Sequence, residues 1–358
     1  MTLLRGYGDD LQLDEWLQTR IWPVEARLTD DDVYWGTRLA AVEMIRSGTV
    51  HLLHMYWHAP AVARALEHAG LRGAVSQPLL DGLDPARVAD LRAEALAGLA
   101  ELEATGPLIT ACLGPHSIYA VSEESLAFLG ELSAERDVPV HIHCAETRTE
   151  VDDCVAAHGV RTVPYLDRVG LLTTRTVLAH GVWLDDAELE LVAERGATIV
   201  TNPVSNLKLA VGEVFRYRAA RARGISVGLG TDGAASNNSL DLLQDVKVLA
   251  LLQKHATRDP AALPAHEAFD VLTGRLAGRL GQSGLIAVGE PADFVLVRGE
   301  APELAPGNLL ANLVYAASGA VVDTTVVAGR VLMRGRMIEG EEEVRVRAVE
   351  CARRLGIA

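Results

Sequence analysis

The sequence has few cysteines and no long apolar run. Its four cysteines, in 358 residues, include no Cys-x-x-Cys pair, which argues against a disulfide framework and favours reduced thiols. No apolar segment is long enough to span a bilayer, and the residues after Met1 do not read as a signal peptide. We therefore expect a cytoplasmic protein that does not engage a membrane.

Basic residues are also in deficit. Lys and Arg total 33 against 48 Asp and Glu, so the formal net charge is −15. Surfaces that bind nucleic acid are basic, because they must neutralise phosphates, so this balance argues against a nucleic-acid partner. Hydrophobic residues make up 49% of the chain, enough to bury a large core.

Short apolar segments alternate with helix-period segments along most of the chain, which predicts βα units and a parallel sheet. A helix is expected over 88–103, and Thr29 is expected to cap a helix that starts with acidic residues. The expected strands cover 49–56, 73–80, 109–116, 139–146, 176–182, 198–203 and 226–232. These seven strands are one short of a closed (β/α)8 barrel.

The pattern changes near Ser283. Residues 292–297 and 324–333 are rich in β-forming side chains, and 341–355 has the charge pattern of a terminal helix. We therefore expect three parts: a metal-dependent hydrolase barrel over 1–285, a β-sandwich portion over 286–340 and a C-terminal helix over 341–358.

Polar residues stand where several of the expected strands end. His141 and His143 alternate along one strand and so share a face, and Glu146 follows them. His180 and Asp232 end two later strands. Each motif alone fits a buried structural role or a turn. Together they would meet at one end of a barrel, where such folds hold their chemistry, and imidazole with carboxylate suits zinc or another divalent metal.

The chain resembles the amidohydrolase superfamily, in the branch of 5'-methylthioadenosine/S-adenosylhomocysteine deaminases. The motifs that carry the resemblance are Met-Thr-Leu-Leu-Arg-Gly from Met1, Gly-Pro-His-Ser at 114–117, His-Ile-His-Cys-Ala-Glu at 141–146, Asn-Pro-Val-Ser-Asn at 202–206 and Gly-Thr-Asp-Gly-Ala-Ala-Ser at 230–236. It implies a metal-dependent hydrolase that deaminates an adenosine-type nucleoside, with one divalent metal, zinc or else iron or manganese, and a dimer or tetramer.

The resemblance also implies roles for single residues. The metal site would use His143, His180 and Asp232, and the catalytic groups would be Glu146, His180 and Asp232. Glu146 would pass a proton to the purine ring. Substrate contacts are implied for Trp16, Glu25, Arg87, His116, Glu146 and Ser236, with Glu25 facing the ribose hydroxyls.

Two departures from the branch bear on activity. A strand ending in His-x-His should come immediately before Met1, and it would supply two further metal ligands. We interpret this as a start assigned too late; the alternatives are a non-catalytic truncated paralogue or a rebuilt site that uses His54. His51 and His54 point to opposite faces of their strand, however, and with His58 they fit local packing or capping. Strands 294–297 and 326–333 would also lack partners.

The second departure concerns specificity. Gln77 stands where the branch tends to place an arginine, and Arg87 is only loosely aligned with a second one, so a substrate carboxylate would be held less firmly. Two rival functions stay open at this point. One is another amidohydrolase activity, such as a guanine or triazine deaminase or a chlorohydrolase, and the other is a pseudoenzyme.

Overall fold

The fold is given by a computed structural model that describes residues 1–277 and 284–357. The strands are β1 (His51–Met55), β2 (Arg72–Ser76), β3 (Pro78–Leu79), β4 (Ile109–Ala111), β5 (Gly114–Pro115), β6 (Val140–Cys144), β7 (Thr176–His180), β8 (Thr198–Thr201), β9 (Ser226–Leu229), β10 (Phe294–Val297), β11 (Val322–Val327) and β12 (Arg330–Met333).

The helices alternate with these strands through the first three quarters of the chain. They are α1 (Leu13–Trp16), α2 (Trp22–Glu25), α3 (Asp30–Ser47), α4 (Ala59–Ala69), α5 (Val88–Glu103), α6 (Glu123–Arg136), α7 (Arg148–His158), α8 (Thr162–Arg168), α9 (Asp186–Arg195), α10 (Pro203–Lys208), α11 (Tyr217–Ala222), α12 (Leu242–Thr257), α13 (Ala265–Leu272), α14 (Leu309–Tyr315) and α15 (Glu341–Leu355). Among the described residues, none of these helices is both long and apolar enough to cross a bilayer.

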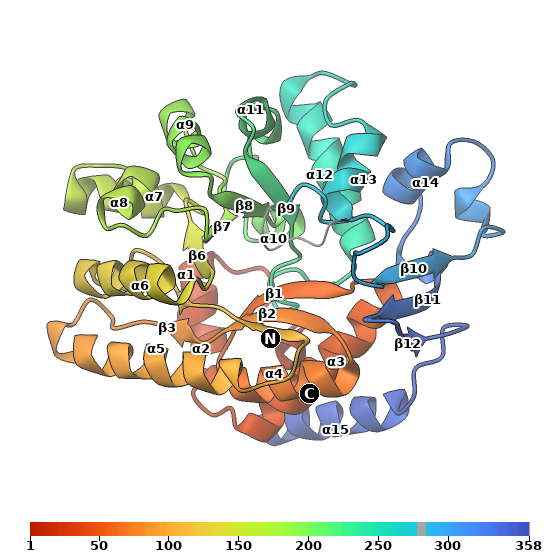
Figure 1. Cartoon of the computed structure of the whole chain (residues 1–358), viewed down its shortest axis with the longest axis horizontal. Helices are drawn as coiled ribbons and strands as arrows, with labels where there is room; N and C mark the ends of the chain where they lie inside the picture. Colours follow the sequence, from red (N-terminus) through yellow and green to blue (C-terminus); the bar gives the residue numbers. More distant parts are fainter. Residues whose placement is uncertain (278–283, 358) are drawn as a thin grey trace.

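Strands β1 to β9 follow one another in chain order and run parallel. β1 pairs with β2 and β2 with β4, β3 pairs with β5, and β6 to β9 form a continuous sheet. A parallel bridge between Leu113 and Val140 joins the two halves. Figure 1 shows the helices that follow these strands arranged around the outside of the arc. Over the described residues no assigned strand pairs with the outer edge of β1 or β9, although Val227 of β9 donates a backbone hydrogen bond to Leu276 at 2.7 Å.

The expected strand segments are present but shorter. The segment over 73–80 is divided into β2 and β3, and the one over 109–116 into β4 and β5. Helix α5 has the expected bounds, and Thr29 caps α3 in a reciprocal capping box with Asp32. These local features follow rules that act over a few residues, which is why the sequence alone predicts them.

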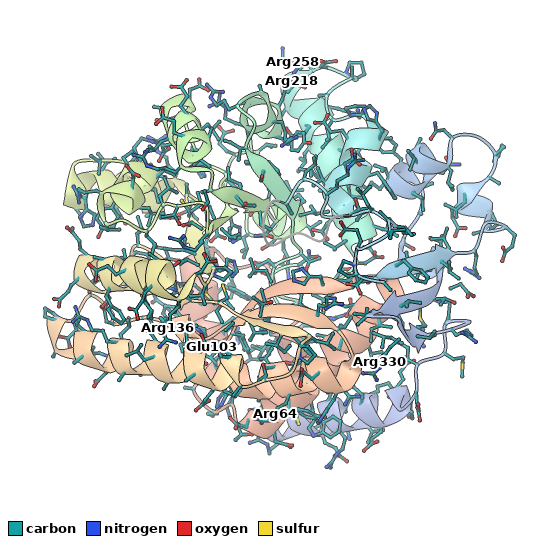
Figure 2. The ribbon with its side chains drawn as sticks, in the orientation of Figure 1. Arg64, Glu103, Arg136, Arg218, Arg258 and Arg330 are labelled. Carbon is teal, nitrogen blue, oxygen red and sulfur yellow. The ribbon has the colours of Figure 1, made fainter. Side chains whose placement is uncertain are left out.

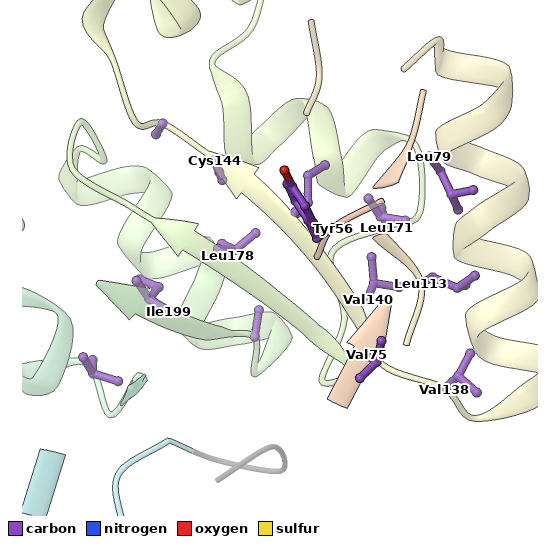
Figure 3. Close-up of a cluster of buried hydrophobic side chains, with 14 of the residues drawn as sticks. Tyr56, Val75, Leu79, Leu113, Val138, Val140, Cys144, Leu171, Leu178 and Ile199 are labelled. Carbon is purple, nitrogen blue, oxygen red and sulfur yellow. The ribbon is translucent and has the colours of Figure 1, made fainter. Parts of the chain in front are cut away.

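The core lies between the strands and the surrounding helices. Apolar side chains on the outer faces of the strands, among them Val75, Leu113, Val140 and Leu178, are buried in one cluster (Figure 3). Charged side chains project from the outer surfaces of the helices, as Figure 2 shows, and Arg136 of α6 pairs with Glu103 of α5 at 3.7 Å. This packed core supports the residues at the strand ends.

The β-rich segments near the C-terminus form a separate antiparallel sheet, in the order β10-β11-β12. The expectation that these segments lack partners is therefore wrong: they pair with each other, and a turn at Ala328-Gly329 divides the second segment into β11 and β12. Arg72 of β2 bonds to the buried Asp293 at 2.6 Å, which ties this sheet to the barrel. The boundary expected near Ser283 lies outside the described residues.

Candidate active site

A cavity of about 1490 Å³ opens among the ends of the parallel strands. Most of the residues predicted from the sequence line it, and they come from widely separated parts of the chain. They are Trp16, Glu25, His116, His143, Glu146, His180, Asp232 and Ser236. Arg87 is the exception: it lies at the start of α5 and lines a separate cavity of about 370 Å³.

His143 and His180 present similar rings to this cavity. Their ring centroids are 5.6 Å apart and the rings are nearly parallel. The Nδ1 of His143 lies 2.7 Å from the carbonyl oxygen of His116, and a carbonyl only accepts, so this nitrogen carries the proton and Nε2 has the free lone pair. His180 Nδ1 lies 2.8 Å from Asn206 Oδ1, which fixes its ring in the same way.

Asp232 follows β9 in a left-handed backbone conformation, with φ of 61°. Its Oδ2 accepts hydrogen bonds from Ser205 Oγ at 2.7 Å and from Ser236 Oγ at 2.6 Å. Burial by itself would raise the pKa of Asp232, but His180 and the two serine hydroxyls outweigh it, and the net shift is downward. Asp232 is therefore an ionised carboxylate held in a fixed orientation. Ser236, predicted to bind substrate, orients Asp232.

Glu146 is the second carboxylate of the site, with only 6% of its surface exposed. Its Oε2 lies 3.7 Å from His180 Nε2. Burial, with a further contribution from the charge of Asp232, raises the pKa of Glu146 to about 7. The pKa of Asp232 is thus lowered and that of Glu146 is raised. Such a difference between two neighbouring carboxyl groups is expected when one accepts a proton and the other donates one.

Three other cavity histidines, each half-buried, have depressed pKa values. Burial lowers the pKa of His141 to about 3, of His116 to about 3 and of His54 to about 4. Within the described part of the chain, His141 Nδ1 and His54 Nε2 have no hydrogen-bond partner. His141 lines the cavity with His143, as the strand alternation predicts.

The three histidines around β1 lie in different settings. His51 and His54 both line the cavity, as does every residue of β1. His58 also reaches the cavity wall. It stands at the N-cap position of α4 without a side-chain capping bond, and its Nδ1 bonds to Asp30 at 2.5 Å instead.

Four residues that support the site were not predicted from the sequence as functional: Ser205, Asn206, Glu150 and Trp57. Ser205 and Asn206 belong to the Asn-Pro-Val-Ser-Asn motif, which is a signal that they matter. Glu150 accepts hydrogen bonds from the backbone of Ala145 and Glu146, and Trp57 donates one to Glu25. No local pattern distinguishes Glu150 or Trp57 from ordinary helix and loop residues.

The donors around the cavity suit a divalent metal chemically. Zinc accepts nitrogen and oxygen ligands, and the cavity offers both kinds. The oriented imidazoles of His143 and His180 and the carboxylate of Asp232 are such ligands, and so are the unpartnered nitrogens of His141 and His54. Among residues 1–277 and 284–357, however, no three His, Cys, Asp or Glu side chains converge tightly enough to hold an ion as they stand.

Comparison with known proteins gives consistent results. The profile of the Amidohydrolase family matches residues 1–332. The chain is 49% identical to a 5'-deoxyadenosine deaminase of Methanoregula boonei, covering 99% of this chain and 81% of that protein. It is 44% identical to 5-methylthioadenosine/S-adenosylhomocysteine deaminase 1 of Archaeoglobus fulgidus, covering 99% and 85%.

Among solved structures, an adenosine deaminase from Xanthomonas campestris with bound zinc superposes with a TM-score of 0.90 and 34% identity, covering 100% of this chain and 83% of that one. The superposition confirms the predicted hydrolase barrel, and the family match confirms the resemblance drawn from the sequence motifs. The chain belongs to the amidohydrolase family.

Proposed function

We propose that the chain catalyses the hydrolytic deamination of an adenosine-type nucleoside in the cavity at the strand ends. The observation that carries the proposal is the meeting of Glu146, His180 and Asp232 in one buried site, in a chain 49% identical to a 5'-deoxyadenosine deaminase. Water adds at C6 of the adenine ring, the C6–N bond breaks, and the products are the hypoxanthine nucleoside and ammonia.

A divalent metal, which we propose to be zinc, would be held by His143, His180 and Asp232. When bound, such an ion makes a water molecule acidic enough to supply hydroxide near neutral pH. The choice of zinc is supported by the Xanthomonas adenosine deaminase, which is 34% identical to this chain and whose structure contains bound zinc.

The two carboxyl groups would divide the proton transfers between them. Asp232, ionised and held by Ser205 and Ser236, accepts the proton that the attacking water loses. Burial raises the pKa of Glu146 to about 7, so near neutral pH it can donate a proton to a purine ring nitrogen and make C6 more electrophilic. His180, whose Nε2 lies 3.7 Å from Glu146 Oε2, orients the attacking oxygen.

The rest of the cavity would hold the nucleoside. Glu25 accepts from the ribose hydroxyls, and Trp16 and His116, which also line the cavity, contact the substrate. Arg87 lies in the second cavity, so we propose that it acts only on substrates whose 5' substituent extends that far.

The test is ammonia release from adenosine, 5'-deoxyadenosine, 5'-methylthioadenosine and S-adenosylhomocysteine, in buffer supplemented with zinc. We expect turnover of at least one of these nucleosides and none of guanine or a chlorotriazine. Ammonia release from guanine and from none of the nucleosides would contradict the proposal and favour the alternative function, a guanine deaminase. The predicted dimer or tetramer and the predicted cytoplasmic location stay predictions, and light scattering of the purified protein checks the first.

A further inference from the structure

The first part of the chain, residues 1–26, lies across the strand ends and contributes to the wall of the active-site cavity. We call it the N-terminal segment. Its buried side chains belong to a smaller apolar cluster, distinct from the main core, which they share with residues that follow the later strands. The members from the segment are Leu4, Trp16, Ile21 and Val24, and those from elsewhere are Val182, Leu209, Val211, Ala235 and Leu355.

Lys208 connects the N-terminal segment to the turn that carries Asp232. It is the last residue of α10, and its ammonium group donates to Asp9 Oδ1 at 2.6 Å, to the carbonyl oxygen of Ala235 at 3.0 Å and to Asn238 Oδ1. Asn238 Nδ2 also donates to Asp9 Oδ2, at 3.4 Å. All three donors of the ammonium group are thus used, and both oxygens of Asp9 accept hydrogen bonds.

The bond between Lys208 and Asp9 lies at the edge of the molecule rather than in the core. The side chains are 25% and 34% exposed, respectively, so the bond is weaker than a buried one. The hydrogen bond from Lys208 lowers the pKa of Asp9, so the carboxylate stays ionised at neutral pH. Lys208 does not line the cavity, so it acts on a ligand there only through the residues that it holds.

The loop around Asp9 is packed on the part of the segment that carries Trp16. Gly8 has a φ of 87°, and a Cβ at this position would lie 2.7 Å from Cγ of Arg20. The loop therefore lies directly against the π-helix Leu17–Ile21, which begins immediately after Trp16. A bond that holds Asp9 in place also holds this helix, and with it the indole of Trp16 in the cavity wall.

We propose that Lys208 is a positioning residue for substrate binding: its bond to Asp9 fastens the N-terminal segment over the cavity and holds Trp16 against the bound nucleoside. The inference rests on the proposed function in one respect, that the bound ligand is a nucleoside. When the bond is removed, the segment opens more often, and the ligand loses its contact with Trp16 and dissociates faster. The proton transfers at Glu146 and Asp232 are unaffected.

Asp9→Ala tests the proposal, because it breaks the bond from the side of the segment and leaves Lys208 its contacts with the Asp232 turn. We expect amide hydrogen exchange over residues 9–25 to become about fivefold faster, as for loss of a partly exposed ion pair, while exchange in α5 is unchanged. The KM for adenosine should rise by a similar factor, with kcat nearly unchanged.

Lys208→Met breaks the same bond from the other side. It should speed exchange over residues 9–25 as much as Asp9→Ala does. The double variant should exchange no faster than either single variant, because the two substitutions remove one interaction. Faster exchange confined to residues 231–238 in Lys208→Met would mean that Lys208 serves only the Asp232 turn, and it would overturn the proposal.

Lys254→Met is the matched control. The ammonium group of Lys254 also bonds three oxygens, all of them backbone carbonyls of the loop after α12, and Lys254 does not line the cavity. We expect this variant to match the unsubstituted protein in the KM for adenosine and in exchange over residues 9–25. Equal changes in Lys254→Met and Lys208→Met would show a general loss of stability and overturn the proposal.

Binding of inosine, the product of adenosine deamination, separates this proposal from the proposed reaction. Inosine should slow exchange over residues 9–25, and calorimetry should show that it binds Asp9→Ala about fivefold more weakly than the unsubstituted protein. If no nucleoside releases ammonia but both results hold, the reaction is wrong and the role of Lys208 stands. If Asp9→Ala leaves exchange over residues 9–25 or inosine binding unchanged, the role of Lys208 is wrong.

Discussion

The carboxylate of Glu150 holds the backbone of Glu146. Its Oε2 accepts from the N–H of Glu146 at 2.9 Å, while its Oε1 accepts from the N–H of Ala145 at 2.8 Å. Ala145 has a φ of 50°, a left-handed conformation that is unfavourable for alanine, and the two hydrogen bonds stabilise it. The bend directs Glu146 from the end of β6 into the cavity, so the position of Glu146 depends on Glu150.

Glu150→Gln should therefore lower kcat about 10- to 100-fold with little change in KM. A glutamine side chain has one accepting oxygen, and its NH2 group would face a backbone N–H, so the bend relaxes and Glu146 shifts. Steady-state kinetics at constant zinc concentration measures the effect. Glu188→Gln is the control, because Glu188 is equally buried and accepts from the backbone of Val163 and Asp185, away from the cavity. If both variants lose kcat alike, Glu150 serves general stability only.

Glu146→Gln should reduce kcat by about 10²- to 10⁴-fold, because the amide has no acidic proton to donate to the purine. Zinc content should not fall, since Glu146 is outside the proposed ligand set. Ammonia release and metal analysis on the same preparation check both parts. Turnover within a few-fold of the unsubstituted protein would remove Glu146 from its proposed role.

Zinc binding by this 358-residue chain should be weak, because its described residues do not form a tight group of three ligands. Dialysis against a chelator should leave well under one zinc per chain, and His143→Ala should reduce the zinc content further. His158→Ala is the comparison, since His158 stacks on Tyr165 and does not line the cavity. Tight stoichiometric zinc in the unsubstituted chain would contradict the prediction.

Asp245 should make stability depend on pH. It is buried beneath the Asp232 turn, where Asn237 Nδ2 donates to it, and burial raises its pKa to about 7. The folded chain holds this proton more tightly than the unfolded chain, so the stability contribution of Asp245 is greatest below about pH 4 and declines as the pH rises to about 7.

Asp245→Asn removes this ionisation. The change that it causes in the free energy of unfolding should therefore be more favourable at pH 8 than at pH 5, by an amount on the order of 1–3 kcal/mol. Urea unfolding at the two pH values gives the comparison. Asp259→Asn, at an exposed ion pair with Arg218, should show no such pH dependence. An equal effect of Asp245→Asn at both pH values would mean that the group is already ionised in the folded state.

The sequence by itself determined the parallel βα order and the residues at the strand ends. Alternation along a strand and the shared direction of parallel strand ends are local rules, so they bring His143, His180 and Asp232 to one cavity in any barrel built from these segments. Helix propensity and capping preferences are also local, so the bounds of α5 and the role of Thr29 as the N-cap of α3 could be predicted as well.

Only the tertiary structure decided which distant residues support those groups. Trp57 meets Glu25 across 32 positions of sequence, and Asn206 meets His180 across 26. It also placed Arg87 in a separate cavity and paired β10, β11 and β12 with one another. These contacts depend on the path of the chain between elements, and that path is set by packing of the whole core rather than by any pattern within a few residues.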